Sequence, residues 1–195
     1  MNNQFLAQLK ISLNTYTPIE HSEWQKLSLI FKEKNYEKGQ NLIDPNMDKS
    51  KIFFVCKGLI RYYYLSEDGK EWNKAFINEN TLSSSFTIDF LGDNSPYAVQ
   101  ALEDTAILIS DYSQFEELFE SNPSIERLGR MFIEKVLISK MKRERSFLSK
   151  SAKARYLDFL EHYPSLCKRI PQYHIASYLG IGEASLSRIT GTLER

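Results

Sequence analysis

The side chains best suited to recognising another molecule lie near the C-terminal end of the chain. Ser185, Ser187 and Arg188 fall on the outward side of a short predicted helix. A guanidinium group can donate two hydrogen bonds at once to a planar acceptor such as the edge of guanine, and a hydroxyl group can donate or accept one. These side chains therefore predict recognition through hydrogen bonds, in which no covalent bond is made or broken.

Two short helices joined by a tight turn would position these side chains. The first helix, around residues 171–179, has one apolar face, made by Ile175, Ala176 and Leu179. Pro171 suits its first position, and Gly180 can take the left-handed conformation that lets the chain reverse. The second helix has its own apolar face, made by Leu186, Ile189 and Leu193. This pattern is typical of a helix-turn-helix, whose second helix enters the DNA major groove, although a purely structural helical hairpin has similar faces.

The bulk composition is that of a folded protein without a membrane segment. Of the 195 residues, 42% are hydrophobic and 26% are charged, which are globular values. Because no run of about 18 apolar residues is present, we expect no membrane span. The first residues lack the basic and apolar blocks of a secretory signal, and the only cysteines, Cys56 and Cys167, lie far apart. These features predict a reducing, cytoplasmic location.

The formal net charge is zero, but the two signs are separated along the chain. Residues 1–122 contain 11 Lys and Arg against 18 Asp and Glu, a net charge of −7. Residues 123–195 contain 14 Lys and Arg against 7 Asp and Glu, a net charge of +7. An acidic first part and a basic last part indicate that the last part meets phosphate. A solvated basic helix is the alternative for the basic residues at 140–145.

The motifs of common enzyme classes are absent from the sequence. It has no G-x-S-x-G, no phosphate-binding loop and no obvious pair of carboxylates in a pocket context. Two cysteines cannot supply a four-cysteine zinc or iron–sulfur site. His162, Cys167 and His174 are close in sequence, but a helix end, a linker and a second helix would hold them, which does not favour a metal site. We therefore expect no catalytic residue, no metal and no enzyme activity.

Short strands should fill the middle of the chain, after a helical N-terminus at residues 2–34 with a break near Thr17. Runs rich in β-branched and aromatic residues, bounded by glycine turns, predict strands at 36–43, 52–56, 59–65, 71–77, 97–102 and 105–110. Asp68 and Gly69 predict a hairpin turn between strands 59–65 and 71–77. Strands 97–102 and 105–110 are expected to pair with each other. Strands at this regular spacing favour a jelly-roll-like barrel or sandwich.

Helices should dominate the rest of the chain. A short helix at 111–119, capped by Asp111, precedes the longest helical run, residues 124–148. One face of this long helix is marked by Leu128, Phe132 and Val136, and another by Ile133, Leu137, Met141 and Leu148. A helix that is apolar on two sides has two neighbours, for which the barrel and the same helix of a second subunit are the candidates. A further helix at 151–162 leads to the C-terminal pair.

Three stretches carry a resemblance to a known family. They are YAVQALEDT at 97–105, RLGR at 127–130 and PQYHIASYLGI at 171–181. Together with the order of helix, small barrel, long helix and helix-turn-helix, they make nearly the whole chain resemble the catabolite-activator/fumarate-nitrate-regulator (Crp/Fnr) superfamily of bacterial transcription factors. The branch that the chain most resembles is the set of short regulators common in Bacteroidetes.

The resemblance implies an α+β fold with three parts. These are a jelly-roll-like β-barrel of the cyclic-nucleotide-binding type with flanking helices at 1–122, a long dimerisation helix at 123–149 and a helix-turn-helix domain at 150–195. In that family the barrel is a sensor, and a homodimer reads a palindromic operator in double-stranded DNA with half-sites about 34 Å apart. RNA polymerase is a further candidate partner.

The resemblance does not extend to the binding of cyclic nucleotide. Family members that bind this ligand carry Gly-Glu near the start of a phosphate-binding cassette and Arg-Ser or Arg-Thr near its end. Here the first site reads Asn80-Thr81-Leu82, and no arginine occurs between Arg61 and Arg127. Lys74 offers only a point charge, so the phosphate would lack a bidentate partner. We therefore expect neither cyclic nucleotide nor another cofactor.

Four aromatic residues of this region have two possible roles. They either line an apolar pocket for an unknown effector or form the core of the barrel; they are Trp72, Phe76, Phe86 and Phe90.

The resemblance also implies which residues contact DNA. The set is Gln172, Glu183, Ala184, Ser185, Ser187 and Arg188. Gln172 would contact phosphate and Arg188 would pair with guanine. Glu183 would accept from cytosine or stabilise the start of its helix, and Ala184, where the family usually has Arg or Glu, would contact only a thymine methyl group.

The sequence thus predicts a dimeric, sequence-specific DNA-binding transcriptional regulator of the Crp/Fnr type that does not respond to cyclic nucleotide. The alternative is a ligand-binding or protein-interaction module with the same barrel, whose C-terminal hairpin no longer reads DNA. The small number of Arg and Lys residues on the predicted recognition face keeps this alternative open.

Overall fold

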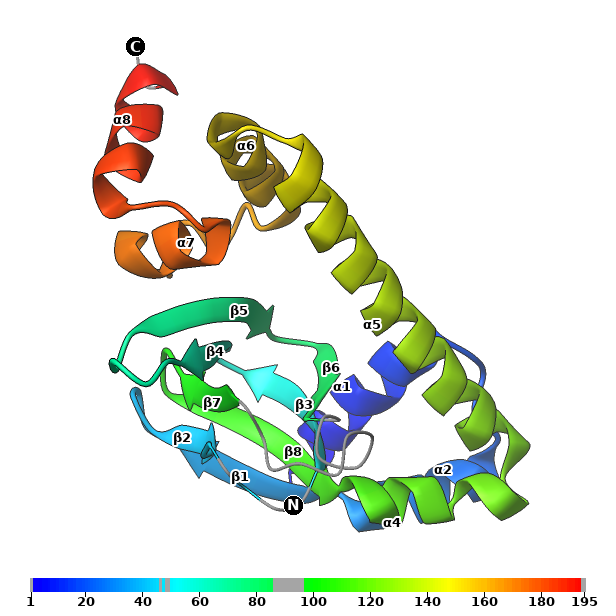
Figure 1. Ribbon diagram of the computed structural model, residues 1–195. Coiled ribbons are helices and arrows are strands. Elements are labelled where there is room, and N and C mark those ends of the chain that lie inside the picture. Colours follow the sequence, from blue (N-terminus) through cyan, green and yellow to red (C-terminus); the bar gives the residue numbers. More distant parts are fainter. Residues whose placement is uncertain (1, 46, 48–49, 86–96, 194–195) are drawn as a thin grey trace.

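The structure, a computed structural model, describes residues 2–45, 47, 50–85 and 97–193 (Figure 1). Two helices come first, α1 (Asn3–Leu13) and α2 (His21–Ile30). The strands are β1 (Lys32–Tyr36), β2 (Asn41–Ile43), β3 (Lys51–Lys57), β4 (Leu59–Leu65), β5 (Glu71–Asn78), β6 (Thr81–Ser84), β7 (Tyr97–Ala101) and β8 (Thr105–Asp111). The helices α4 (Tyr112–Glu117), α5 (Pro123–Ser149), α6 (Ala152–His162), α7 (Gln172–Leu179) and α8 (Glu183–Leu193) follow, with a short 3-10 helix at Phe119–Ser121. No helix in this described part of the chain is long and apolar enough to cross a membrane.

Among the described residues, the strands form two four-stranded antiparallel sheets, in the orders β1-β8-β3-β6 and β2-β7-β4-β5. Successive side chains of a strand point to opposite faces. On β3, Phe53 and Val55 therefore enter the space between the sheets, whereas Phe54 and Cys56 face outward. The space between the sheets also holds Tyr62 of β4 and Tyr97 of β7. The two sheets thus enclose one apolar interior, as in a sandwich.

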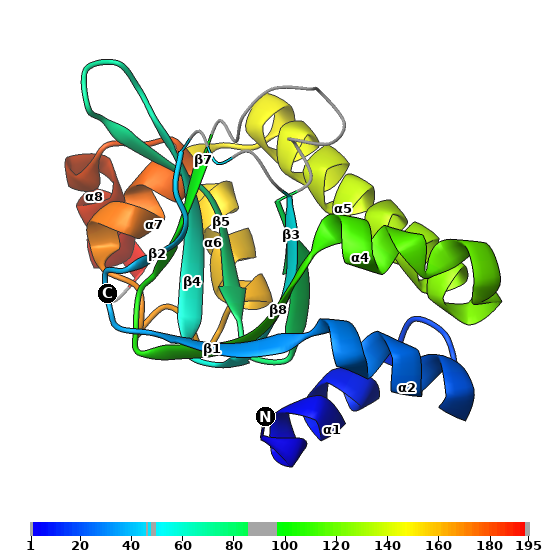
Figure 2. The same cartoon turned by 90° about the horizontal axis from the view of Figure 1, so that it is seen from below.

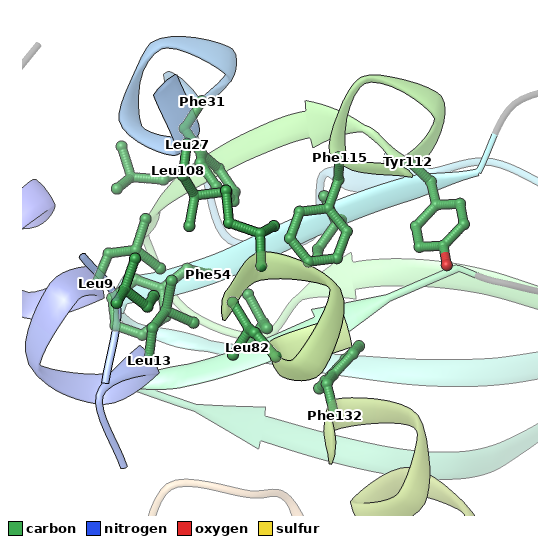
Figure 3. Close-up of a cluster of buried hydrophobic side chains, with 14 of the residues drawn as sticks. Leu9, Leu13, Leu27, Phe31, Phe54, Leu82, Leu108, Tyr112, Phe115 and Phe132 are labelled. Atoms are coloured by element: carbon green, nitrogen blue, oxygen red, sulfur yellow. The ribbon is translucent and has the colours of Figure 1, made fainter. Parts of the chain in front are cut away.

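The N-terminal helices and the first half of α5 cover the outer face of the first sheet. Figure 3 shows that side chains from these helices, from α4 and from the sheet converge there, among them Leu9, Leu13, Leu27, Phe54, Leu108, Phe115 and Phe132. Each such side chain contributes about 1.5–3 kcal/mol when it is fully buried. This packing fixes the start of α5 against the barrel.

The C-terminal helices lie on the opposite side of the strands from α1, α2 and α4 (Figure 2). A third apolar cluster joins the second sheet to these helices. Its buried members are Leu59, Phe76, Leu102, Tyr156, Phe159, Leu166, Ile170, Ile175, Ala176, Leu179 and Leu186. The helix pair is therefore packed onto the barrel by an apolar core of its own.

The structure confirms most of the predicted elements and corrects three details. The hairpin of β4 and β5 turns at Asp68 and Gly69, and Gly69 has a φ of +78°. Residues 32–34, which the sequence places in the N-terminal helices, belong to strand β1. The strands near 97–102 and 105–110 do not pair with each other, because β7 lies in the second sheet and β8 in the first. Asp111 precedes α4 as predicted, but its carboxylate pairs with Lys51 and does not cap the helix.

Gly58, between β3 and β4, supports a stability prediction. Its φ is +94°, and a Cβ there would lie 2.8 Å from the Asp104 carbonyl oxygen. Gly39 has a similar φ of +88° but no atom within 4 Å of that position, so it is a matched control. We expect Gly39→Ala to lower the free energy of unfolding by about 1–2 kcal/mol. Gly58→Ala should lower it clearly further in urea denaturation, and equal losses would contradict this contact.

Candidate nucleic-acid interface

The turn between α7 and α8 has the geometry that the sequence predicts. Gly180 has a φ of +66°, and its N–H donates to the carbonyl groups of Ala176 and Ser177. The Ile181 N–H donates to the Ala176 carbonyl at 3.1 Å, which closes the end of α7. A Cβ on Gly180 would lie 2.7 Å from the ring of Phe147 on α5, so the position also needs a small residue. Pro171 lies just before α7 and is not its first residue.

The predicted DNA-contacting residues lie near the surface of this helix pair. Glu183, Ala184, Ser187 and Arg188 are exposed on α8, Ser185 is half-buried, and Gln172 is exposed at the start of α7. The four exposed residues of α8 are spaced i, i+1, i+4 and i+5, so they form one stripe along the helix. We call this stripe the α8 face; its contacts with bases stay a prediction.

Arg188 is folded back on its own helix. Its Nε donates to the Ala184 carbonyl oxygen at 3.3 Å, and its Nη2 donates to Ser185 Oγ at 3.4 Å. Both bonds are long and exposed to solvent, so their loss costs little. The guanidinium group can therefore extend away from the helix by side-chain rotation alone.

The inner side of α7 is docked on strand β5 (Figure 1). The backbone N–H of Asn73 donates to Ser177 Oγ at 2.9 Å, and the Ser177 hydroxyl donates to the Glu71 carbonyl oxygen at 3.2 Å. The Asn73 amide nitrogen also donates to the His174 carbonyl oxygen at 3.2 Å. Because β5 is an edge strand, α7 satisfies backbone groups that the sheet leaves open.

A buried arginine organises this contact. Arg61 is 3% exposed and forms an ion pair with Glu71 at 2.6 Å. Its guanidinium nitrogens also donate to the side-chain oxygens of Gln100, at 2.7 and 2.9 Å, and of Asn73, at 3.2 Å. Its Nη1 lies 3.1 Å from His174 Nδ1. We call Arg61, Glu71, Asn73, Gln100 and His174 the Arg61 cluster.

His174 acts in this cluster as a neutral hydrogen-bond acceptor. Both groups that face its Nδ1, the Arg61 guanidinium and the Asn73 amide nitrogen, can only donate, so Nδ1 accepts and the ring proton lies on Nε2. Burial, followed by the charge of Arg61, lowers the pKa of His174 to about 4. No group of three His, Cys, Asp or Glu side chains that could hold a metal ion occurs in the described part of the chain.

Further arginines hold the ends of α7. Arg143 of α5 donates to the Tyr178 carbonyl oxygen at 2.8 Å, and Arg155 of α6 donates to that of Leu179 at 3.1 Å. Cations at the C-terminal end of a helix complement its dipole. Before α7, Arg169 forms ion pairs with Glu79 at 2.8 Å and with Glu103 at 2.7 Å.

The sequence prediction missed the Arg61 cluster. One signal could have revealed part of it, since Arg61 is the only charged residue in the run Leu59–Leu65. An arginine in a buried strand needs partners, and their identity is not visible in a local pattern. His174, which the sequence left without a role, supplies one of them.

The sequence left two alternatives for four aromatic residues, the lining of an apolar pocket in the barrel or the core of the barrel, and neither holds for Trp72 and Phe76. Phe76 faces out of the barrel and packs against Phe159 and Tyr178 of the C-terminal helices. Trp72 is 41% exposed near the β4–β5 turn. Phe86 and Phe90 lie outside the described residues.

The second apolar face of α5 is exposed along its second half. Leu128 and Phe132 are buried against the barrel, whereas Leu137 is 57% exposed and Met141 is 59% exposed. Ile138, Met141 and Leu148 line a shallow apolar groove on this side. The two faces therefore occur as the sequence predicts, and among the described residues only the first face is covered.

Comparisons with known proteins agree with this architecture. Residues 33–122 match the family model of the cyclic nucleotide-binding domain. The fumarate and nitrate reduction regulatory protein of Vibrio cholerae is 23% identical over 193 residues, covering 91% of this chain and 75% of its own length.

Solved structures show the same fold. The structure of FixK2 from Bradyrhizobium japonicum has a TM-score of 0.71 at 20% identity, covering 85% of each chain. A regulator described as a member of the Crp/Fnr family, from Eubacterium rectale, has a TM-score of 0.69 at 17% identity, covering 92% of this chain and 88% of its own. These findings confirm the resemblance to the Crp/Fnr superfamily and the predicted fold class.

The environment of His174 predicts a dependence of stability on pH. The pKa of His174 is about 4 in the folded chain and about 6.5 in the unfolded chain, so protonation of His174 favours the unfolded chain. The stabilisation is complete above about pH 6.5 and is lost as the pH falls towards about 4, by a total of about 3 kcal/mol. We expect His174→Gln to make the free energy of unfolding depend less on pH over this range, as measured by urea denaturation at several pH values.

The exposed His162 provides the control for this measurement. His162→Gln should keep the pH dependence of the unaltered chain. If His174→Gln and His162→Gln gave the same pH profile, the buried acceptor role of His174 would be refuted.

Proposed function

We propose that this chain, which has the fold of the Crp/Fnr regulators, is a dimeric, sequence-specific DNA-binding transcriptional regulator. The observation that carries the proposal is the α8 face, a polar stripe exposed on the second helix of a well-packed helix-turn-helix. A helix of this kind fits the major groove, where each base pair shows a distinct pattern of donors and acceptors. The similarity to a fumarate and nitrate reduction regulatory protein supports the proposal that this chain is a regulator as well.

The α8 face assigns different tasks to its residues. Arg188 pairs with guanine O6 and N7, because its guanidinium group is the one side chain of the α8 face that offers two parallel donors. Glu183 accepts from the amino group of cytosine, and Ala184 contacts a thymine methyl group. The hydroxyl groups of Ser185 and Ser187 and the Gln172 amide bind bases or phosphates at the edge of this contact.

Two copies of the chain bind together through the exposed face of α5. Leu137, Ile138 and Met141 are each more than half exposed, and burying them against the same residues of a second copy removes apolar surface from water. A two-fold axis along this face would present two α8 faces to the same side of DNA. The operator is then a palindrome with half-sites about 34 Å apart.

Some family members bind cyclic nucleotide in the barrel, and the barrel of this regulator does not bind it in that way. The domain match covers the barrel, yet the sequence between Arg61 and Arg127 contains no arginine for the phosphate. The protein acts in the cytoplasm, where its DNA and RNA polymerase are found. The net charge of +7 on residues 123–195 contributes affinity for phosphate that declines as salt increases.

Replacing Arg188 tests the reading of DNA. First, selection from a random-sequence pool should enrich a palindrome; a module that no longer reads DNA would enrich nothing. On that palindrome, Arg188→Ala should lose about 1–3 kcal/mol of specific affinity and relax one position per half-site. Fluorescence anisotropy at two salt concentrations measures both effects.

Arg130→Ala is the matched control, because Arg130 lies on α5 with its side chain 56% exposed and away from the α8 face. It should keep the affinity and the sequence preference. Unchanged specificity after Arg188→Ala would remove the proposed role of this residue.

A charge in the exposed face of α5 tests the dimer. Leu137→Asp should convert the protein to monomers, because it would bury unpaired carboxylates between the two helices. Leu29→Asp is the control, since Leu29 is also exposed, at 80%, but lies on α2. Sedimentation velocity distinguishes the two states, and dimers of the Leu137→Asp protein would place the interface elsewhere.

A further inference from the structure

The β4–β5 hairpin of the barrel faces the helix-turn-helix across a hollow. This hollow has a volume of about 390 Å³. One wall is made by hairpin residues 70–73, and the other by residues of α7 and by the turn from Gly180 to Glu183. In Figures 1 and 2 the turn of the hairpin lies on the same side of the molecule as α8. The barrel and the helix-turn-helix therefore share one depression of the surface.

The hollow borders the predicted DNA contact at two points. Tyr173 lines it and directly follows Gln172, the predicted phosphate contact at the start of α7. Glu183 also lines it and is the first residue of the α8 face. In a helix-turn-helix complex, the second helix enters the major groove and the first helix crosses the backbone of the DNA. A strand that passes the starts of both helices therefore also passes the hollow and the hairpin.

The hairpin brings two free hydrogen-bond donors to this hollow. Lys70 is exposed, and no ion pair of the described residues includes its ammonium group. This group lies 4.2 Å from the ring centre of Trp72, which is itself 41% exposed. The indole N–H of Trp72 can only donate, and no hydrogen bond within the described part of the chain uses it. Both donors are thus available to a partner from outside.

Three carboxylates near these donors have other tasks. Glu71 forms the ion pair with Arg61 at 2.6 Å, and Asp68 accepts a hydrogen bond within the hairpin turn. Glu183 is exposed on the α8 face, where it is proposed to meet cytosine. None of the three forms an ion pair with the lysine. A bound group that carries negative charge and only accepts hydrogen bonds, as a phosphate of DNA does, would therefore satisfy the donors of the hairpin.

We propose that Lys70 and Trp72 bind one phosphate group of the DNA strand that passes the starts of α7 and α8. This inference rests on the proposed DNA binding and extends its interface from the helix pair to the barrel. The Lys70 ammonium group supplies a point charge, and the indole N–H of Trp72 donates a hydrogen bond to a phosphate oxygen. Because contacts with phosphate position a protein without reading bases, the hairpin contributes affinity and not sequence preference.

The hairpin is held in place to make this contact together with the helices. Within the turn, the Ser66 N–H donates to the Lys70 carbonyl oxygen at 3.0 Å. Next to the turn, the Ser177 hydroxyl of α7 forms hydrogen bonds with the backbone of Glu71 and of Asn73. The hairpin and α7 are thus joined close to Lys70 in the sequence, so little new order has to be created when DNA binds.

The salt dependence of DNA binding tests the contact. The palindrome enriched from a random-sequence pool is titrated by fluorescence anisotropy at several salt concentrations. Each phosphate contact contributes about 0.9 to the slope of the logarithm of the binding constant against the logarithm of the salt concentration. Lys70→Met removes one contact from each copy of the proposed dimer, so the slope should fall by about 1.8. The affinity at low salt should fall several-fold, whereas the base preferences should stay those of the unaltered chain.

Two further variants separate this contact from a general effect of charge. Lys34→Met is the matched control, because Lys34 is also exposed but lies on β1, in the sheet away from the C-terminal helices. It removes the same charge and should keep the slope. Trp72→Phe keeps a ring beside Lys70 but removes the indole N–H, so it should weaken binding with little change in the slope. Urea denaturation checks that the three variants keep the stability of the unaltered chain, as expected for exposed positions.

Operators with one neutral methylphosphonate in place of a phosphate locate the contact. At one position per half-site, this replacement should weaken binding by the unaltered protein but not by the Lys70→Met protein, because the two changes remove the same interaction.

The hairpin contact is excluded if Lys70→Met gives the same slope as Lys34→Met, or if no methylphosphonate position shows this dependence on Lys70. When the unaltered protein binds an enriched palindrome, such a result removes the hairpin contact and leaves the proposed function in place. If the pool enriches no palindrome, the proposed function and the hairpin contact fail together.

Discussion

The placement of the C-terminal helices depends on the buried guanidinium group of Arg61. A cation with 3% exposure is tolerated only when its charge and its donors are satisfied, and here four residues share that task. Gln100 belongs to β7, Asn73 to β5 and His174 to α7, so one side chain connects the second sheet with the helix-turn-helix. Loss of one partner leaves the other groups buried without their bonds, which is why such a cluster forms or breaks as a unit.

Strand β5 connects this cluster with the interior of the barrel. In the pairing of β4 with β5, Lys74 is an extra residue at a β-bulge, and its ammonium group lies 3.6 Å from the ring centre of Tyr97 in the barrel's interior. Its neighbour Asn73 holds α7 through Ser177 and His174. A displacement of the strand at Lys74 is therefore also a displacement of the residue that carries the docking contact. Such a connection changes the position of α7 only if a ligand favours one position over another in free energy.

Local patterns predicted the elements of this fold well, because each element is decided by neighbours in the sequence. The Asp68-Gly69 turn, the two faces of α5 and the left-handed Gly180 are examples. The pairing of strands was harder, since β7 and β8 are consecutive but belong to different sheets. The Arg61 cluster was out of reach, because Arg61 and His174 are 113 residues apart and meet only after both parts have folded. The outward α8 stripe follows from helix periodicity; what it contacts depends on a partner.

The α8 face carries a single arginine, so little of the specificity for DNA can come from bidentate contacts with guanine. One bidentate arginine contributes about 1–3 kcal/mol of discrimination per half-site. Specific complexes with DNA are typically about 4–10 kcal/mol more stable than non-specific ones, so two such arginines, at about 2–6 kcal/mol together, reach at most the lower part of this range. In the proposed dimer, the remaining specificity must come from requirements that both copies impose together, namely the spacing and the symmetry of the half-sites. Those requirements are strict only if α7 and α8 are held rigidly, and in this chain the Arg61 cluster and the arginines at the end of α7 hold them.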